Sequence, residues 1–158
     1  RCASVRLISN SPETNDLPEI TLVGRGHYKR LLDVNESPEV RSCRNDGAGM
    51  HIWEWVGQAP EEARRMQGTM HSKFAVFDGQ RALVGSYNLD PRSELLNSES
   101  AIVFLQPELA GRLRQKFLDE DLRYARQITA ERAAGFENPA DVIERFRKSL
   151  GQAFEEQL

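Results

Sequence analysis

The 158-residue sequence lacks several features that would each assign it to a particular class of protein. It has no uninterrupted apolar run near the roughly 20 residues that a membrane-spanning helix requires. It has no excess of basic residues, since 21 Lys and Arg stand against 24 Asp and Glu, whereas a general nucleic-acid binder carries such an excess. With 7 Pro, 11 Gly and no internal repeat, it is neither collagen-like nor of low complexity. The 39% of hydrophobic residues is enough for one globular domain over residues 1–158.

Cysteine is also scarce, with only Cys2 and Cys43 in the chain. A small secreted domain built on disulfides would need more cysteines, and these two lack the spacing of metal ligands. We therefore expect two free thiols, with a Cys2–Cys43 bridge as the alternative for an exported protein. The sequence begins at Arg1 rather than Met, so we expect it to be part of a longer chain.

Strand and helix signals alternate along the chain. Short strands are expected where β-forming residues cluster, over residues 5–8, 50–56, 71–77, 81–85 and 99–105. Asp78-Gly79 between two of these strands predicts a tight hairpin turn. Residues 36–49 and 58–68 are rich in turn formers and are expected to be surface loops.

Helices are expected over residues 27–34, from residue 107 and from Pro139, for which Asn138 is the predicted N-cap. Their apolar residues recur at helical spacing and comprise Leu31, Leu32, Leu109, Leu113, Phe117, Val142, Ile143, Phe146 and Leu150. Strands and helices together predict an α/β, mixed α+β fold built in layers.

Four polar side chains are expected to meet near the ends of two neighbouring strands. His71 and Lys73 are two residues apart and therefore share one face of a strand. Ser86 and Asn88 are again two apart, where the returning strand ends. Placing a lysine beside a histidine away from water is unfavourable unless an anion compensates the charge. One potential nucleophile, one cation and two hydrogen-bond donors suit a phosphate better than a carbonyl group.

The spacing His71-x-Lys73-x4-Asp78-x6-Gly85-Ser86-x-Asn88 resembles the HKD signature of the phospholipase D superfamily at every defined position. The segments 88–93 and 97–99 resemble the stretch that follows the second HKD motif of bacterial cardiolipin synthases. The resemblance covers roughly residues 4–125. It implies a phospholipase D-type mixed β-sheet flanked by helices on both faces.

The resemblance also implies a role for each matched residue. His71 would attack phosphorus and form a covalent phosphohistidine, or would protonate the leaving oxygen. Lys73 and Asn88 would hold the non-bridging oxygens, and Ser86 would support the same site. Glu99 would hydrogen-bond the catalytic histidine and fix its tautomer.

Other residues of the motif are expected to support structure or substrate. Side chains alternate between the two faces of a strand, so Asp78 is expected to point away from His71, and it opens the hairpin turn. We therefore assign Asp78, like Gly85, a structural role. Tyr87 and Arg92 are candidate substrate contacts. No metal and no cofactor are implied, because a lysine and hydrogen-bond donors take the place of a metal ion.

A single HKD copy cannot complete the reaction, because in-line displacement puts nucleophile and leaving group on opposite sides of phosphorus. A second half must supply the other histidine, either from an identical chain or from the same longer polypeptide. With one motif at residues 71–88 and C-terminal helices over residues 107–158, we expect the second half of a two-motif chain. A further His-x-Lys-x4-Asp is expected upstream of Arg1.

The sequence thus predicts a phosphodiesterase or phosphatidyltransferase that acts on phospholipids, as in cardiolipin synthesis or phospholipase D hydrolysis. We expect a bacterial protein that is cytoplasmic or membrane-associated, with transient contact to a membrane surface. One alternative is a homodimeric nuclease of the same superfamily, although the acidic charge balance argues against a nucleic-acid partner. Another is a non-catalytic interaction module, or a half that is inactive in isolation. His27, His51, Trp53 and Trp55 are expected to be surface or packing residues.

Overall fold

The computed structural model describes residues 2–15, 18–43, 47–57, 68–88 and 91–146, and the chain divides into two compact units. Unit 1 comprises Arg1–Met70 and Tyr124–Leu158, and unit 2 comprises His71–Arg123. Each unit contains a three-stranded sheet and helices. The mixed α+β class predicted from the sequence is therefore confirmed.

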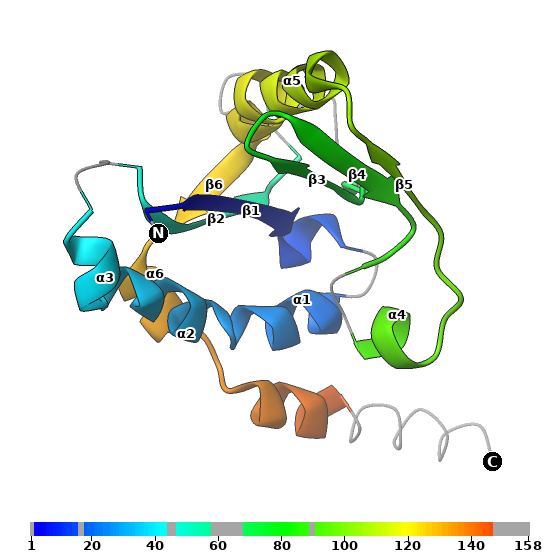
Figure 1. Ribbon diagram of the computed structural model, residues 1–158. Coiled ribbons are helices and arrows are strands. Elements are labelled where there is room, and N and C mark those ends of the chain that lie inside the picture. The colour runs from blue at the N-terminus through cyan, green and yellow to red at the C-terminus, as the bar shows by residue number, and fades with distance from the viewer. Residues whose placement is uncertain (1, 16–17, 44–46, 58–67, 89–90, 147–158) are drawn as a thin grey trace. The chain divides into compact units, whose positions relative to one another are not determined.

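Unit 1 is built on a sheet with strand order β1-β2-β6. β1 (Ser4–Asn10) and β2 (Gly49–Trp55) run parallel, and β6 (Ala125–Ile128) pairs antiparallel with β2. A parallel pair needs a crossover connection. Here the connection carries three short helices, α1 (Pro18–Arg25), α2 (Tyr28–Leu32) and α3 (Pro38–Arg41) (Figure 1).

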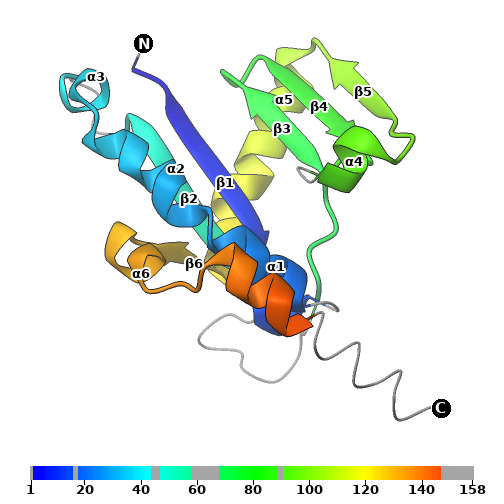
Figure 2. The same cartoon turned by 90° about the horizontal axis from the view of Figure 1, so that it is seen from below.

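The core of unit 1 lies between α2 and the sheet. Ile52 of β2 and Ile128 of β6 are opposite one another in register and are 0% and 2% exposed. Tyr28 and Leu32 are one helical turn apart, so both project from the same face of α2 into this core. α2 lies alongside β2, as the view in Figure 2 also shows. Leu31 packs against the same cluster, which confirms the predicted buried side of this helix.

The C-terminal part of unit 1 adds two helices. α6 (Ala130–Ala134) begins after Thr129, whose hydroxyl accepts the N–H of Arg132 at 3.2 Å. Residues 139–146 form a second helix. The side-chain oxygen of Asn138 accepts the N–H of Ala140 at 2.9 Å, so the predicted cap is confirmed.

The predicted apolar stripe of this last helix is buried only in part. Val142 is 1% exposed, whereas Ile143 and Phe146 are 39% and 38% exposed. Leu150, the last predicted member, lies outside the described residues. Across the described ranges, no helix combines the length and apolar character that crossing a bilayer demands.

Unit 2 is an antiparallel sheet of β3 (Phe74–Phe77), β4 (Arg81–Gly85) and β5 (Ala101–Phe104). Asp78 and Gly79 have φ angles of 54° and 65°, and this left-handed backbone forms the tight β3–β4 turn that the sequence predicted. α5 (Pro107–Gln115) packs on β3 and β4, with Ala110 fully buried (Figure 1). α4 (Pro91–Leu95) lies in the connection from β4 to β5.

The predicted strand over residues 71–77 is too long and requires correction. β3 begins only at Phe74, which pairs with Val84. One more hydrogen bond extends the pairing, because the N–H of Gly85 donates to the carbonyl of Lys73 at 3.0 Å. Beyond that point the chain after β4 pairs instead with the segment before β5, since Ser86 N–H donates to the carbonyl of Ser100 at 2.9 Å. His71 therefore lies ahead of the strand.

Several elements were not predicted. They are α1, α3, α4, α6 and β6, all of which span eight residues or fewer and show no complete periodic apolar stripe. The loop predicted for residues 36–49 is wrong near its start, where Ser37 caps α3 by accepting the N–H of Val40 at 3.3 Å. The loop predicted for residues 58–68 lies almost wholly outside the described residues.

The prediction of two free thiols is wrong, because Cys2 and Cys43 form a disulfide with their Cα atoms 5.5 Å apart. The cause is the parallel pairing of β1 and β2. Ser4 is opposite Gly49 in register, so the residues just before β1 and the loop before β2 meet at one end of the sheet. Neither cysteine alone carries a sequence signal for this proximity.

Reduction of the disulfide is expected to lower the free energy of unfolding by about 2–4 kcal/mol, because the bond closes a loop of intermediate length. The sequence separation of the two cysteines is 41 residues. Urea unfolding with and without dithiothreitol measures the difference, and the Cys2→Ser/Cys43→Ser variant, which has no thiol to oxidise, serves as the control. Titration of two free thiols in protein purified without reductant would contradict the assignment.

Candidate functional site

The ends of two strands in unit 2 bring the predicted polar side chains together. His71 and Lys73 come directly before β3, and Ser86 and Asn88 come directly after β4. Because β3 and β4 are antiparallel, the start of one lies beside the end of the other. The structure thus places all four residues at the same edge of the sheet, as the sequence predicted.

The neighbouring strand β5 contributes the fifth predicted residue. Ala101 at its start pairs with Gly85, so the residues just before β5 lie beside those just after β4. A Cβ atom at Gly85 would lie 2.5 Å from the carbonyl oxygen of Ser100, and only glycine permits this close approach. Glu99 therefore reaches the side chain of Ser86.

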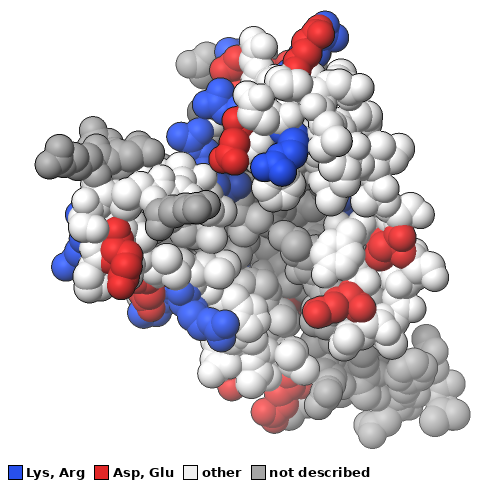
Figure 3. Space-filling view, in the orientation of Figure 1, with Lys and Arg blue, Asp and Glu red and all other residues white. Residues whose placement is uncertain are grey.

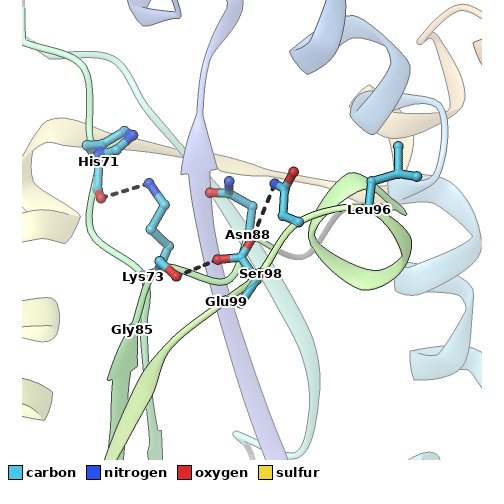
Figure 4. A pocket seen from close by; sticks show the side chains of 9 residues that line it. His71, Lys73, Gly85, Asn88, Leu96, Ser98 and Glu99 are labelled. Carbon is cyan, nitrogen blue, oxygen red and sulfur yellow. Dashed lines mark hydrogen bonds between the residues drawn. The ribbon is translucent and has the colours of Figure 1, made fainter.

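These residues line an open hollow of about 740 Å³ in unit 2 (Figure 4). Its lining residues are His71, Lys73, Gly85, Ser86, Asn88, Leu96, Asn97, Ser98 and Glu99. His71 and Asn88 are exposed to solvent, whereas Lys73 is half-buried. The hollow combines an imidazole, an ammonium group and several hydrogen-bond donors, a set that suits an anionic oxygen-rich group.

The ammonium group of Lys73 lies in the hollow, where it hydrogen-bonds to the backbone. Its Nζ atom donates to the carbonyl oxygen of His71 at 3.0 Å (Figure 4). None of the ion pairs between described residues includes Lys73. The ammonium group therefore has donor capacity left for an anion in the hollow.

Glu99 accepts hydrogen bonds from two side chains that also line the hollow. The hydroxyl of Ser86 donates to its Oε2 atom, and Nδ2 of Asn97 donates to its Oε1 atom at 3.3 Å (Figure 4). These bonds favour the ionised carboxylate, and the bond from Ser86, followed by one from Ser93, lowers the pKa of Glu99 below its ordinary value. No hydrogen bond between described residues joins Glu99 to His71, so the tautomer-fixing role expected for Glu99 stays a prediction.

Two of the other predicted residues, Asp78 and Tyr87, lie outside the lining of the hollow. Asp78 stands in the hairpin turn at the far end of β3, separated from Lys73 by the length of that strand, roughly 15 Å. Tyr87 is half-buried between Ser86 and Asn88 but does not line the hollow. Arg92 belongs to α4, and its side chain lies outside the described residues.

Four residues near the site were not predicted to belong to it. Asn97 and Ser98 line the hollow, and their place just before Glu99 was the signal that could have found them. Ser93 is 4% exposed and its hydroxyl accepts the backbone N–H of Asn88 at 3.1 Å. Leu96 also lines the hollow, and as one exposed apolar residue it gave no sequence signal.

The residues expected to be ordinary surface or packing groups lie in unit 1, outside this hollow. His27 is exposed beside α2, and His51 in β2 hydrogen-bonds through Nε2 to the carbonyl of Gly47 at 3.2 Å. Trp55 packs against Tyr124 with ring centroids 5.5 Å apart, in agreement with a packing role.

Acidic and basic side chains occur together on the face of the molecule that Figure 3 draws. On the face drawn in Figure 3, acidic and basic side chains alternate and build no large field of one sign. Within the described ranges, no three His, Cys, Asp or Glu side chains cluster closely enough to hold a metal ion. The hollow itself brings together one ammonium group, Lys73, one carboxylate, Glu99, and several hydrogen-bonding side chains.

Comparisons with known proteins find similarity to cardiolipin synthases. A family profile described as "Cardiolipin synthase, PLD-like domain" matches residues 3–121. An uncharacterized protein of Helicobacter pylori is 45% identical over 115 residues, which is 73% of this chain and 21% of that protein. Cardiolipin synthase C of Escherichia coli is 26% identical over 129 residues, which is 81% of this chain and 26% of that protein.

A cardiolipin synthase of Staphylococcus aureus is 39% identical over 67 residues, which is 42% of this chain and 13% of that protein. No solved structure matches the chain. The chain spans about a quarter or less of the length of these curated relatives.

Proposed function

The chain belongs to the family of cardiolipin synthase phospholipase D-like domains, and from this premise we propose that it contributes half of a phosphodiester-transferring active site. The observation that carries the proposal is the hollow in which His71, Lys73 and Asn88 converge, with the Lys73 ammonium group hydrogen-bonded to the backbone and in none of the ion pairs between described residues. The proposed reaction is transfer of a phosphatidyl group between alcohols, or to water.

The proposed chemistry has two displacements at phosphorus. In the first, a ring nitrogen of one histidine attacks, a P–N bond forms, and the P–O bond to the leaving alcohol breaks as a second histidine protonates it. In the second, an acceptor alcohol or water gives its proton to that second histidine and attacks phosphorus, and the P–N bond breaks. His71 takes one of these two roles.

Lys73 and Asn88 would stabilise the negative charge on the non-bridging oxygens during both steps. A fixed ammonium group and an amide donor need no reorganisation when charge develops, and such prearranged donors contribute much of the rate enhancement in enzymes. Ser86 would act on the same oxygens or through Glu99, to which it donates.

The second histidine must come from another HKD half, because the two histidines act on opposite faces of phosphorus. We propose that this half is part of the same longer polypeptide, as expected from the sequence, or a second copy of the chain. The curated relatives are about four times as long as the matched region or more, which leaves room for another half within one chain.

A phospholipid substrate is favoured over a nucleic acid by two features of the described residues. Leu96 lines the hollow and is 79% exposed, and its chain neighbour Leu95 is 75% exposed. An amphiphilic substrate can contact such side chains with its apolar part. The face drawn in Figure 3 carries acidic and basic side chains together and shows no basic stripe of the kind that tracks a nucleic-acid backbone.

The Leu95→Ser variant tests the lipid assignment. We expect its kcat/KM on phospholipid vesicles to fall about 10-fold, since loss of one buried leucine contact with lipid is worth roughly 1.5 kcal/mol or more. Turnover of a soluble diester such as bis(p-nitrophenyl) phosphate is expected to fall less than about threefold, since the phosphate chemistry is retained.

Leu105→Ser is the matched control, because Leu105 is 70% exposed but lies beyond the far end of β5. An equal loss in both variants would contradict a local lipid contact. Cleavage of single-stranded DNA in preference to vesicles by the wild-type protein would favour the nuclease alternative.

A further inference from the structure

Asn10, the last residue of β1, makes two hydrogen bonds to the main chain of one distant residue, Met70. Its Nδ2 atom donates to the carbonyl oxygen of Met70 at 2.9 Å, and its Oδ1 atom accepts the N–H of Met70 at 2.9 Å. The two residues are 60 positions apart in the sequence. An asparagine amide carries both a donor and an acceptor, so it can satisfy both polar groups of one residue as a neighbouring strand does.

Further hydrogen bonds hold the two residues just before this contact. Nε1 of Trp55 donates to the carbonyl oxygen of Gly68 at 2.6 Å. The hydroxyl of Thr69 donates to the carbonyl oxygen of Thr14, which follows β1, also at 2.6 Å. Asn10 and Trp55 are opposite one another in register at the ends of β1 and β2. The ends of this parallel strand pair therefore anchor the chain at three successive residues.

The contact bears on His71 because Met70 directly precedes it. The atoms from the Cα of Met70 to the Cα of His71 lie in one peptide plane, so a bond that holds the carbonyl oxygen of Met70 also holds the N–H of His71. On the other side, the carbonyl oxygen of His71 accepts from Nζ of Lys73 at 3.0 Å. The pairing of β3 with β4 begins only at Phe74, so these bonds act where the sheet does not.

We propose that Asn10 is a positioning residue that holds the peptide plane between Met70 and His71 and so limits the orientations open to the His71 imidazole. The proposal rests on the proposed function for its effect on rate, but not for its effect on the main chain. Without the amide, the chain that enters His71 gains freedom, and the ring spends less time where it can act on phosphorus. Misplacement of a reacting group by about 1 Å costs as much as 100-fold in rate.

Asn35 provides a matched control within unit 1. Its Nδ2 atom donates to the carbonyl oxygen of Met50 at 2.8 Å, and its Oδ1 atom accepts the N–H of Met50 at 2.7 Å. Met50 is also followed by a histidine, but His51 does not line the hollow, whereas His71 does. Removal of the Asn35 amide thus deletes the same two bonds to a methionine main chain without a link to the candidate site.

The test measures kcat and KM of Asn10→Ala and Asn35→Ala on bis(p-nitrophenyl) phosphate, with any second half that the chain requires. We expect kcat of Asn10→Ala to fall about 10- to 100-fold with little change in KM, because Lys73 and Asn88 still bind the phosphate. Asn35→Ala is expected to keep the kcat of the wild type. Asn10→Asp preserves the size of the side chain but cannot donate to the carbonyl of Met70, so we expect its kcat to fall as well.

Hydrogen exchange of the Met70 amide and the NMR signals of the His71 imidazole need no turnover. Asn10→Ala is expected to speed exchange at Met70 and to shift the His71 signals, whereas Asn35→Ala is expected to speed exchange at Met50 alone. Unchanged exchange at Met70, an unchanged kcat in Asn10→Ala or Asn10→Asp, or an equal fall in Asn35→Ala would overturn the proposal. Faster exchange at Met70 with shifted His71 signals, in a chain that cleaves no phosphodiester, would support the positioning role and contradict the proposed function.

Discussion

Replacement of His71 by asparagine is expected to reduce phosphodiester turnover by about 10⁴-fold or more, since covalent catalysis fails when its nucleophile or its proton donor is removed. Asparagine has a similar size and can hydrogen-bond, but its amide neither attacks phosphorus nor transfers a proton near neutral pH. His71 is exposed and precedes β3, so the substitution leaves the sheet pairing of Phe74 with Val84 intact.

The rate is best measured on phospholipid vesicles and on a soluble diester, over a range of protein concentrations. The concentration series detects activity that depends on a second copy of the chain. His27→Asn is the matched control, because His27 is exposed in unit 1 and is expected to have no role in chemistry. Equal turnover by wild type and His71→Asn would remove His71 from the mechanism.

Replacement of Arg25 by methionine is expected to lower the free energy of unfolding by about 3–5 kcal/mol, the usual result of leaving a buried charge without its partner. The partner is Glu54 of β2, whose side chain is 0% exposed. Nε and NH2 of Arg25 both donate to its carboxylate at 2.6 Å, and Arg126 adds a longer contact at 3.3 Å. The bond to Glu54 raises the pKa of Arg25, which therefore stays charged throughout the accessible pH range.

Urea unfolding followed by circular dichroism measures this loss. Lys29→Met is the control, because Lys29 pairs with Asp33 on the surface, where the two side chains are 56% and 50% exposed, and such pairs contribute about 0.5 kcal/mol or less. The double variant Arg25→Met/Glu54→Leu is expected to recover much of the stability, since it removes both charges. If Arg25→Met were as stable as Lys29→Met, the ion pair between Arg25 and the buried Glu54 would not contribute the predicted free energy of unfolding.

The site could be predicted largely from the sequence because short-range rules place its residues. Asp78-Gly79 dictates a hairpin, so the residues just before β3, His71 and Lys73, lie near Ser86 just after β4. The strands with β-forming residues were predicted within about two residues of their ends, except β3, whose predicted start at residue 71 is three residues too early.

The features that were missed depend on contacts between distant residues. β6 has the sequence Ala-Arg-Gln-Ile, which has weak strand preference, yet it pairs with β2 and places Arg126 opposite the buried Glu54. The Cys2–Cys43 bridge follows from the register of β1 and β2. Ser93 contacts a site residue only because it lies in α4, a helix of five residues, where its hydroxyl accepts the backbone N–H of Asn88.

Trapping of the covalent intermediate tests the central claim most directly. Vesicles are mixed with the protein and with any second half it requires, the reaction is quenched in alkali because a P–N bond is labile in acid, and the peptides are analysed by mass spectrometry. The account predicts a phosphatidyl group on a histidine of an HKD motif. In the His71→Asn variant this adduct is absent if His71 is the nucleophile and forms more slowly if His71 is the acid. Turnover with no histidine adduct, or an adduct that forms equally in His71→Asn, would contradict it.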